Sequence, residues 1–165
     1  MEVKEEKEVN EVKDRSVPVG PVKNYKDLLV YRQAYKLALQ TSKLTKALPR
    51  EEQYELGKQL RRCARSVPAN VVEGWAKRNS AADFKRHLVI ASGEVAECRF
   101  WIELAVDEGF LSRNHSEQIL KEYAKLGFMI YKTLEGVEEA VIWGSSFTSF
   151  TSFTSFTSIY ERACK

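Results

Sequence analysis

The stretch from Phe84 to Ala105, FKRHLVIASGEVAECRFWIELA, carries the pattern that decides the fold. Its apolar residues recur with alternating spacings of four and three, at Phe84, Leu88, Ala91, Val95, Cys98, Ile102 and Ala105. On an α-helix this spacing makes one continuous apolar stripe about six turns long. Because such a stripe has to be covered by partner helices, the stretch predicts an all-α helical bundle.

Three further segments repeat this periodicity, so the chain predicts an antiparallel, up-down-up-down four-helix bundle over residues 25–143. We expect helices at 25–47, at 51–77, between Ser80 and Gly109, and at 114–139. Pro49 ends the first helix, and the short connection around it favours antiparallel packing of the first two helices. Ser80, three residues before Asp83, is typical of a helix start, and Gly109 of a helix end. The other three seams consist of Val30, Ala34, Leu37, Thr41, Leu44 and Leu48; Leu56, Leu60, Cys63, Val67, Asn70 and Gly74; and Ile119, Tyr123, Leu126, Ile130, Leu134 and Val137.

The two ends of the chain have a different composition. Residues 2–15 contain six acidic and four basic side chains and almost no large apolar ones, so we expect residues 1–24 to form a disordered charged arm. Phe-Thr-Ser occurs four times in tandem from Phe147 to Ser158, which makes residues 144–165 a low-complexity tail. Two interpretations of the tail stay open: a segment without function, or a β-prone segment that associates with itself or a partner.

Composition and cysteine usage exclude several classes of protein. A chain of 18.9 kDa with 44% hydrophobic and 30% charged residues is typical of a single globular domain. No apolar run reaches the roughly 18 residues of a membrane span, and the first residues lack the apolar centre of a signal peptide, so we expect a cytoplasmic protein. Cys63, Cys98 and Cys164 are widely spaced, which favours reduced thiols over a disulfide framework or a zinc site.

Positive charge is concentrated in the second and third helices. Residues 57–87 carry eight basic and two acidic side chains, a net charge of +6 against +3 for the whole chain. Four of the cations recur at i, i+3, i+4 and i+7 on the second helix, and this stripe is predicted to face away from the core. The candidate nucleic-acid-binding residues are Lys58, Arg61, Arg62, Arg65, Lys77, Arg78, Lys85 and Arg86. The alternative is a solvated helix face, or arginines paired with Glu94 and Glu97 of a neighbouring helix.

A second group of residues, Asn70, Glu73 and Gly74, forms a polar motif near the end of the second helix. Asn70 and Gly74 occupy seam positions, so the glycine would allow close helix approach and the amide would have to find partners inside the bundle. Such an amide can specify the register of neighbouring helices. Pro68 predicts a kink in the same region, and a ligand pocket built from Asn70 and Glu73 is the functional alternative.

The third helix has more apolar surface than its seam uses. The residues on its flank are candidates for a subunit interface: Ile90, Glu94, Glu97, Trp101 and Leu104. We therefore expect self-association.

Motifs of catalysis are missing from the sequence. A di-iron bundle needs Glu-x-x-His, but Phe84 stands three residues before His87, and Ser112 three before His115. There is no dinucleotide-binding, phosphate-loop or nucleophile-elbow motif. We predict that the protein is not an enzyme and has no catalytic residues, metal or cofactor.

Five motifs in order resemble a known family. They are Tyr31–Tyr35, Leu48–Leu56, Gln59–Val67, Asn70–Gly74 and Ala91–Glu94. They resemble the four-helix-bundle proteins encoded in intervening sequences of bacterial large-subunit (23S) rRNA genes, and the likeness spans about residues 28–134. The chain departs from the family pattern in three residues: Tyr31 stands where tryptophan is expected, Pro68 lies inside the second helix, and Glu94 replaces the usual serine.

This family looks related to the accessory bundle proteins of diversity-generating retroelements, which form barrel-like pentamers and bind nucleic acid and a reverse transcriptase. The resemblance therefore implies a bacterial, cytoplasmic, pentameric bundle whose partners are RNA or DNA. Our leading hypothesis is a homo-oligomer that binds nucleic acid without base specificity. The alternatives are a scaffold that docks on a reverse transcriptase or another protein, and a structural product of an rRNA intervening sequence with no defined cellular role.

Overall fold

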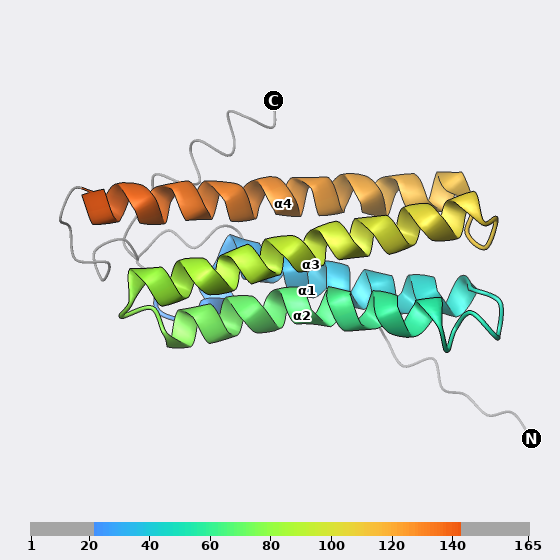
Figure 1. The fold of residues 1–165 in the computed structure, drawn as a ribbon, viewed down its shortest axis with the longest axis horizontal. Coiled ribbons are helices and arrows are strands. Elements are labelled where there is room, and N and C mark those ends of the chain that lie inside the picture. Colours follow the sequence, from blue (N-terminus) through green and yellow to red (C-terminus); the bar gives the residue numbers. More distant parts are fainter. Residues whose placement is uncertain (1–21, 143–165) are drawn as a thin grey trace, which may run out of the picture.

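The computed structural model describes residues 22–142, and within this range the chain is helical, without a strand. The long helices are α1 (Leu29–Leu44), α2 (Leu56–Ala76), α3 (Ala81–Asp107) and α4 (Arg113–Ile142), and two short 3-10 helices, η1 (Tyr25–Asp27) and η2 (Thr45–Ala47), flank α1. The four long helices lie lengthwise beside one another, and successive helices are joined at alternate ends (Figure 1). α1 packs on α2, α2 on α3, α3 on α4, and α4 closes the ring against α1. The predicted all-α four-helix bundle is thus confirmed, and the alternating connections agree with the expected antiparallel order.

The heptad seam of α3 forms the centre of the core. All seven of its residues are at most 4% exposed. The residues predicted for the other three seams are buried as well, except Leu44, Asn70 and Leu134, which are half-buried. Periodicity alone therefore identified the inward face of each helix.

The two ends of α3 are where the sequence predicts them. The Ser80 side chain accepts a hydrogen bond from the Asp83 backbone N–H at 3.2 Å, which satisfies one of the free donors at the helix start. Gly109 follows the helix with a φ of +78°, a conformation that a residue with a Cβ rarely adopts. The short turn after it leads directly into α4.

The start of the second helix was predicted wrongly. The expected helix begins at residue 51, but residues 50–55 form turns and α2 begins at Leu56. The Gln53 side chain folds back to donate hydrogen bonds to the carbonyls of Lys46 at 3.3 Å and Leu48 at 2.9 Å. It caps the chain that leaves α1, so its own segment does not continue as helix.

The first helix is also shorter than predicted. Asn24 and Asp27 form a capping box that closes a single 3-10 turn, and Leu28 is then extended, so α1 begins only at Leu29. At the other end, the last residues of the predicted helix tighten into η2. The break before α1 comes from this capping box, a local signal that apolar periodicity does not detect.

Several predictions fall on residues outside the described range. The arm expected at residues 1–24 is described only for residues 22–24, and the Phe-Thr-Ser tail lies outside the described range altogether.

α2 continues through Pro68, which is buried, and the kink expected there stays a prediction. None of the helices in the described range is both long and apolar enough to cross a membrane.

Candidate functional site

Two of the four cations predicted to form a stripe on α2 are free to act from the surface. Lys58 and Arg65 are exposed, and neither makes a hydrogen bond or ion pair within residues 22–142. Arg61 is half-buried and donates from Nη1 to Thr45 Oγ1 at 3.1 Å and from Nη2 to the Gln53 carbonyl at 2.9 Å. Arg61 therefore holds the connection between α1 and α2 in place. The stripe pattern predicted that it faces solvent freely, and this was wrong.

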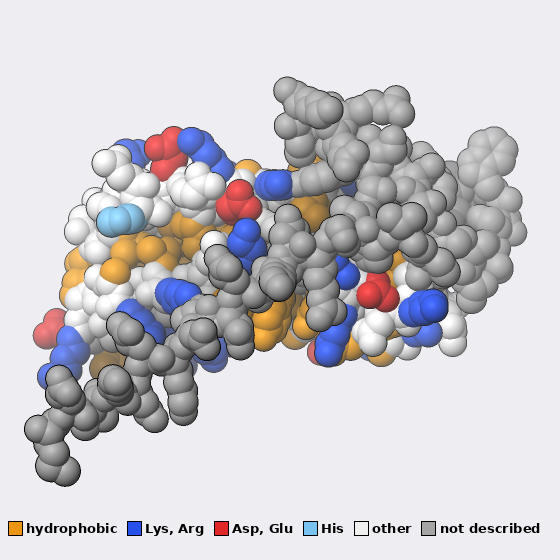
Figure 2. Space-filling view, turned by 180° about the vertical axis from the view of Figure 1, so that it is seen from behind, with side chains coloured by type: hydrophobic (Ala, Val, Ile, Leu, Met, Phe, Trp, Pro, Cys, Tyr) orange, Lys and Arg blue, Asp and Glu red, His pale blue; other side chains and the backbone are white. Residues whose placement is uncertain are grey.

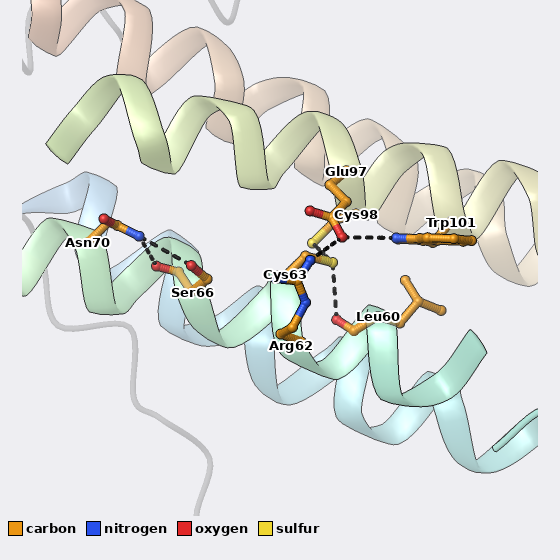
Figure 3. A network of polar contacts seen from close by, with 8 residues as sticks. All are labelled: Leu60, Arg62, Cys63, Ser66, Asn70, Glu97, Cys98 and Trp101. Atoms are coloured by element: carbon orange, nitrogen blue, oxygen red, sulfur yellow. Dashed lines mark hydrogen bonds and ion pairs between the residues drawn. The ribbon is translucent and has the colours of Figure 1, made fainter. Parts of the chain in front are cut away.

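Arg62 is exposed but bound to the neighbouring helix. Its Nη2 donates to Glu97 Oε1 at 2.7 Å, and the Trp101 indole Nε1 donates to the same oxygen at 3.1 Å (Figure 3). This hydrogen bond raises the pKa of Arg62. The alternative that arginines pair with acidic residues of α3 thus holds for Arg62 and Glu97. Glu94 is different, because its Oε2 is buried without a hydrogen-bond partner in the described part of the chain.

The remaining predicted cations surround the turn between α2 and α3. Lys77 Nζ lies 3.0 Å from His87 Nε2. The Arg78 guanidinium lies 4.5 Å from the centroid of the Trp75 ring and also donates to the Trp75 carbonyl at 3.0 Å. Arg86 is exposed and has no hydrogen bond or ion pair among the described residues, whereas Lys85 is half-buried. The turn therefore gathers four cations at one end of the bundle.

The polar motif joins α2 to α3. Asn70 Nδ2 donates to the Ser66 carbonyl at 3.0 Å and lies 3.2 Å from Ser66 Oγ, as Figure 3 shows. Asn70 Oδ1 is 3.3 Å from Nδ1 of His87, and Glu73 Oε2 is 3.7 Å from the same nitrogen. Since the Lys77 ammonium can only donate, Nε2 of His87 must accept, which leaves its hydrogen on Nδ1, facing Asn70. The amide nitrogen is thus bound within α2 and the amide oxygen faces α3, while the role of Asn70 in specifying the helix register stays a prediction.

Gly74 allows the close approach of the two helices. A Cβ built on it would lie 3.1 Å from the Cβ of His87 and 3.1 Å from Cδ2 of Phe84. Both neighbours are buried on α3, so a larger residue would push the helices apart. The hydrogen bonds of Asn70 and the packing of Gly74 serve the α2–α3 contact.

Two thiols meet at the middle of the same contact. Cys63 and Cys98 are completely buried free cysteines, with their Sγ atoms 2.8 Å apart. The contact with Cys63, together with burial, raises the pKa of Cys98, so its thiol stays protonated. A buried, protonated thiol is a poor nucleophile. Within the described residues there is also no cluster of three or more His, Cys, Asp or Glu side chains that could hold a metal.

Of the interface candidates on α3, Ile90 is the most accessible. It is 41% exposed, whereas Glu94, Glu97, Trp101 and Leu104 are half-buried. Two apolar residues not predicted from the sequence are more exposed, Val89 at 58% and Phe100 at 54%. The exposed apolar surface of α3 is thus centred on Val89, Ile90 and Phe100.

Sequence reasoning also missed a groove of about 590 Å³ between α1, α4 and the turn that joins α3 to α4. It has an apolar floor that includes Leu44, Phe110 and Ile119, and a polar rim that includes Lys36 and His115. Its lining comes from three separate segments of the chain, so no single sequence motif predicts it.

These features define a helical bundle protein. The family model of the 23S rRNA-intervening sequence protein matches residues 26–132, and the chain belongs to this family. A similar solved structure is that of a protein of unknown function from the S23 ribosomal protein family of Bacteroides thetaiotaomicron. It is 26% identical, with a TM-score of 0.60, and the match covers 65% of this chain and 96% of the other. Comparison with curated proteins returns no match.

Proposed function

We propose that the protein binds nucleic acid without base specificity through the basic surface formed by α2 and the α2–α3 turn. The observation that carries the proposal is the set of three exposed cations, Lys58, Arg65 and Arg86, that lack an ion pair within residues 22–142. Cations that are not neutralised by the protein attract phosphates and release counterions on binding. Figure 2, which shows the molecule from behind relative to Figure 1, has lysine and arginine side chains spread over that face, beside exposed hydrophobic ones.

The contacts within the protein narrow the set of predicted binding residues. Arg61 and Arg62 already donate to protein oxygens, so we assign them a supporting role. Lys77 and Arg78 keep their charge although they contact His87 and Trp75, and they add to the potential at the turn. The proposal therefore depends mainly on Lys58, Arg65 and Arg86, and the two arginines among them are chosen for the test.

The double variant Arg65→Glu, Arg86→Glu tests the proposal. Each phosphate contact contributes about −0.9 to the slope of log affinity against log salt on duplex DNA, and about −0.7 on single strands. Losing two contacts should make the slope less steep by about 1.4 to 1.8 and weaken binding to all sequences alike. Fluorescence anisotropy titrations over a series of salt concentrations measure both quantities.

A matched control is Lys36→Glu, Lys43→Glu, which changes the charge by the same amount on α1. It should lower affinity much less than the first variant. Equal effects of the two double variants would contradict a localised site, and unchanged binding by folded Arg65→Glu, Arg86→Glu would contradict the proposal as a whole.

We also propose that the protein self-associates through α3. Val89, Ile90 and Phe100 are exposed apolar side chains on one helix, which is typical of a surface that a partner covers. Light scattering should give a mass well above the 18.9 kDa of one chain. The variant Ile90→Glu, Phe100→Glu should shift the mass to that of the monomer, whereas Tyr54→Glu, at a 71% exposed turn residue, should not. A wild-type monomer at all concentrations would exclude this part of the proposal.

The alternative function is a scaffold for a protein partner. Purification from the native cell with and without nuclease separates the two. Bound RNA or DNA supports the basic surface as a nucleic-acid site, whereas an acidic protein that stays bound after nuclease treatment supports the scaffold. The same basic surface serves either partner, so its charge alone does not choose between them.

A further inference from the structure

Three tyrosine rings form a ladder where α1 begins. The rings of Tyr25 and Tyr31 meet edge to face with their centroids 4.9 Å apart. Those of Tyr31 and Tyr35 are stacked, with centroids 5.9 Å apart and 26° between the ring planes. We call Tyr25, Tyr31 and Tyr35 the tyrosine ladder. Tyr35 is 48% exposed, and no other ring in the described residues stacks on it, so the ladder ends in a ring that is open to solvent.

The ladder is fixed to the bundle at its middle ring. Tyr31 is half-buried and packs against the core. Burial and the neighbouring rings of Tyr25 and Tyr35 raise the pKa of Tyr31, so its phenol stays neutral and does not repel an anion. Tyr35 is held by its stacking on Tyr31, which presents its exposed ring in a defined orientation.

Cations lie next to the ladder. η1 contacts α2 as well as α1, and α1 runs antiparallel to α2, so the start of α1 lies against the end of α2 (Figure 1). This end of α2 carries Trp75, with the Arg78 guanidinium over its ring. On the other side, Lys26 Nζ lies 5.9 Å from the centroid of the Tyr25 ring. Two aromatic rings, each with a cation beside it, therefore lie at the same end of the bundle as the α2–α3 turn.

We infer that the tyrosine ladder stacks unpaired bases, and that the ligand of the basic surface is a single-stranded nucleic acid. The inference rests on the proposed function and names its ligand class. An exposed aromatic ring can stack on a base only when the base is unpaired and splayed from its neighbours, because in a duplex both faces of each base are already covered. Phosphates of the same strand are then within reach of the cations at the α2–α3 turn, an arrangement typical of grooves for single strands.

The test compares a labelled oligouridine of about 16 nucleotides with an RNA duplex of the same length, at one salt concentration. The wild-type protein should bind the single strand more tightly. Tyr35→Leu, which removes the ring and keeps an apolar side chain, should weaken binding of the single strand about tenfold and leave duplex binding unchanged. Tyr35→Phe keeps the ring and should keep the affinity.

Tyr54→Leu is the control for loss of a tyrosine, because Tyr54 is 71% exposed in the turn between α1 and α2. It should bind both ligands like the wild type. Photo-crosslinking of the wild-type protein to an oligonucleotide containing bromouridine gives a test that needs no variant. The crosslinked peptides should contain Tyr31 or Tyr35, and crosslinks confined to other parts of the chain would overturn the inference.

The outcomes separate this inference from the proposed function. If the wild type binds neither ligand, both fail. If it binds single strand and duplex equally, and Arg65→Glu, Arg86→Glu weakens both while Tyr35→Leu changes neither, only the inference fails. If Tyr35→Leu weakens both ligands equally, the ladder does not read unpaired bases, and the inference fails as well.

Discussion

Replacing Tyr123 by alanine is expected to lower the free energy of unfolding by about 3–5 kcal/mol, the range for removing a large buried aromatic ring. Tyr123 is 1% exposed, and its hydroxyl is hydrogen-bonded to the hydroxyl of Thr41 at 2.7 Å. This bond crosses from α4 to α1, the least extensive of the four contacts between neighbouring helices. A second side-chain hydrogen bond between these helices runs from Gln33 Nε2 to Glu122 Oε2 at 2.6 Å. Loss of Tyr123 should therefore weaken the contact between α1 and α4, which closes the bundle.

Tyr123→Phe separates the hydroxyl from the ring. It keeps the packing but leaves the completely buried Thr41 hydroxyl without its partner, so a smaller loss of about 1–2 kcal/mol is expected. Phe128→Ala is the control, because Phe128 is an aromatic residue of the same helix that is 41% exposed. Urea unfolding followed by circular dichroism gives all three values. A cost for Tyr123→Ala no larger than that for Phe128→Ala would contradict the account of the seam.

Thr41 and Tyr123 illustrate what the sequence could predict about the fold. Both were assigned to inward seams from spacing alone, and both are buried. Their hydrogen bond could not be predicted, because it depends on the axial position of α4 relative to α1. The same limit applies to Cys63 and Cys98. Their spacing places both on seams, but it does not predict that their Sγ atoms meet. Periodicity fixes the direction in which a side chain points, whereas register decides which partner it meets.

For the cations of α2, too, the sequence predicts the direction of a side chain better than its partner. The spacing of the cations on α2 placed Lys58 and Arg65 on the surface, where the structure has them. The spacing gave no sign that Arg61 would reach the turn after α1, because that turn was expected to be part of the second helix. The sequence offers Glu97 as a partner for the arginines of α2, and in the structure it binds Arg62. The spacing does not predict the exposed ring of Tyr35, because its stacking on Tyr31 depends on the local break at Leu28 and on where α1 begins.

Stability is also expected to fall steeply at alkaline pH. Burial is the main cause that raises the pKa of Tyr123, and the contact with Cys63 is the main cause for Cys98. In the unfolded chain the pKa of tyrosine is about 10 and that of cysteine is about 8.5. Below those values both states hold the protons, and the stability is fully present. Above them the unfolded chain releases protons that the folded protein retains, which favours unfolding.

Each of the two groups should lower the free energy of unfolding by about 1.4 kcal/mol per pH unit above its unfolded pKa. Urea titrations from neutral pH to above pH ~10 measure this slope. Tyr123→Phe and Cys98→Ala each remove one group, so each variant should lose stability more slowly with rising pH than the wild type, although both start from a lower value. Phe128→Ala changes an exposed ring on α4 without removing a titrating group, so it should keep the slope of the wild type. The same slope in Tyr123→Phe and in the wild type would mean that the phenol of Tyr123 reaches water before the bundle unfolds, and that the seam between α1 and α4 opens on its own.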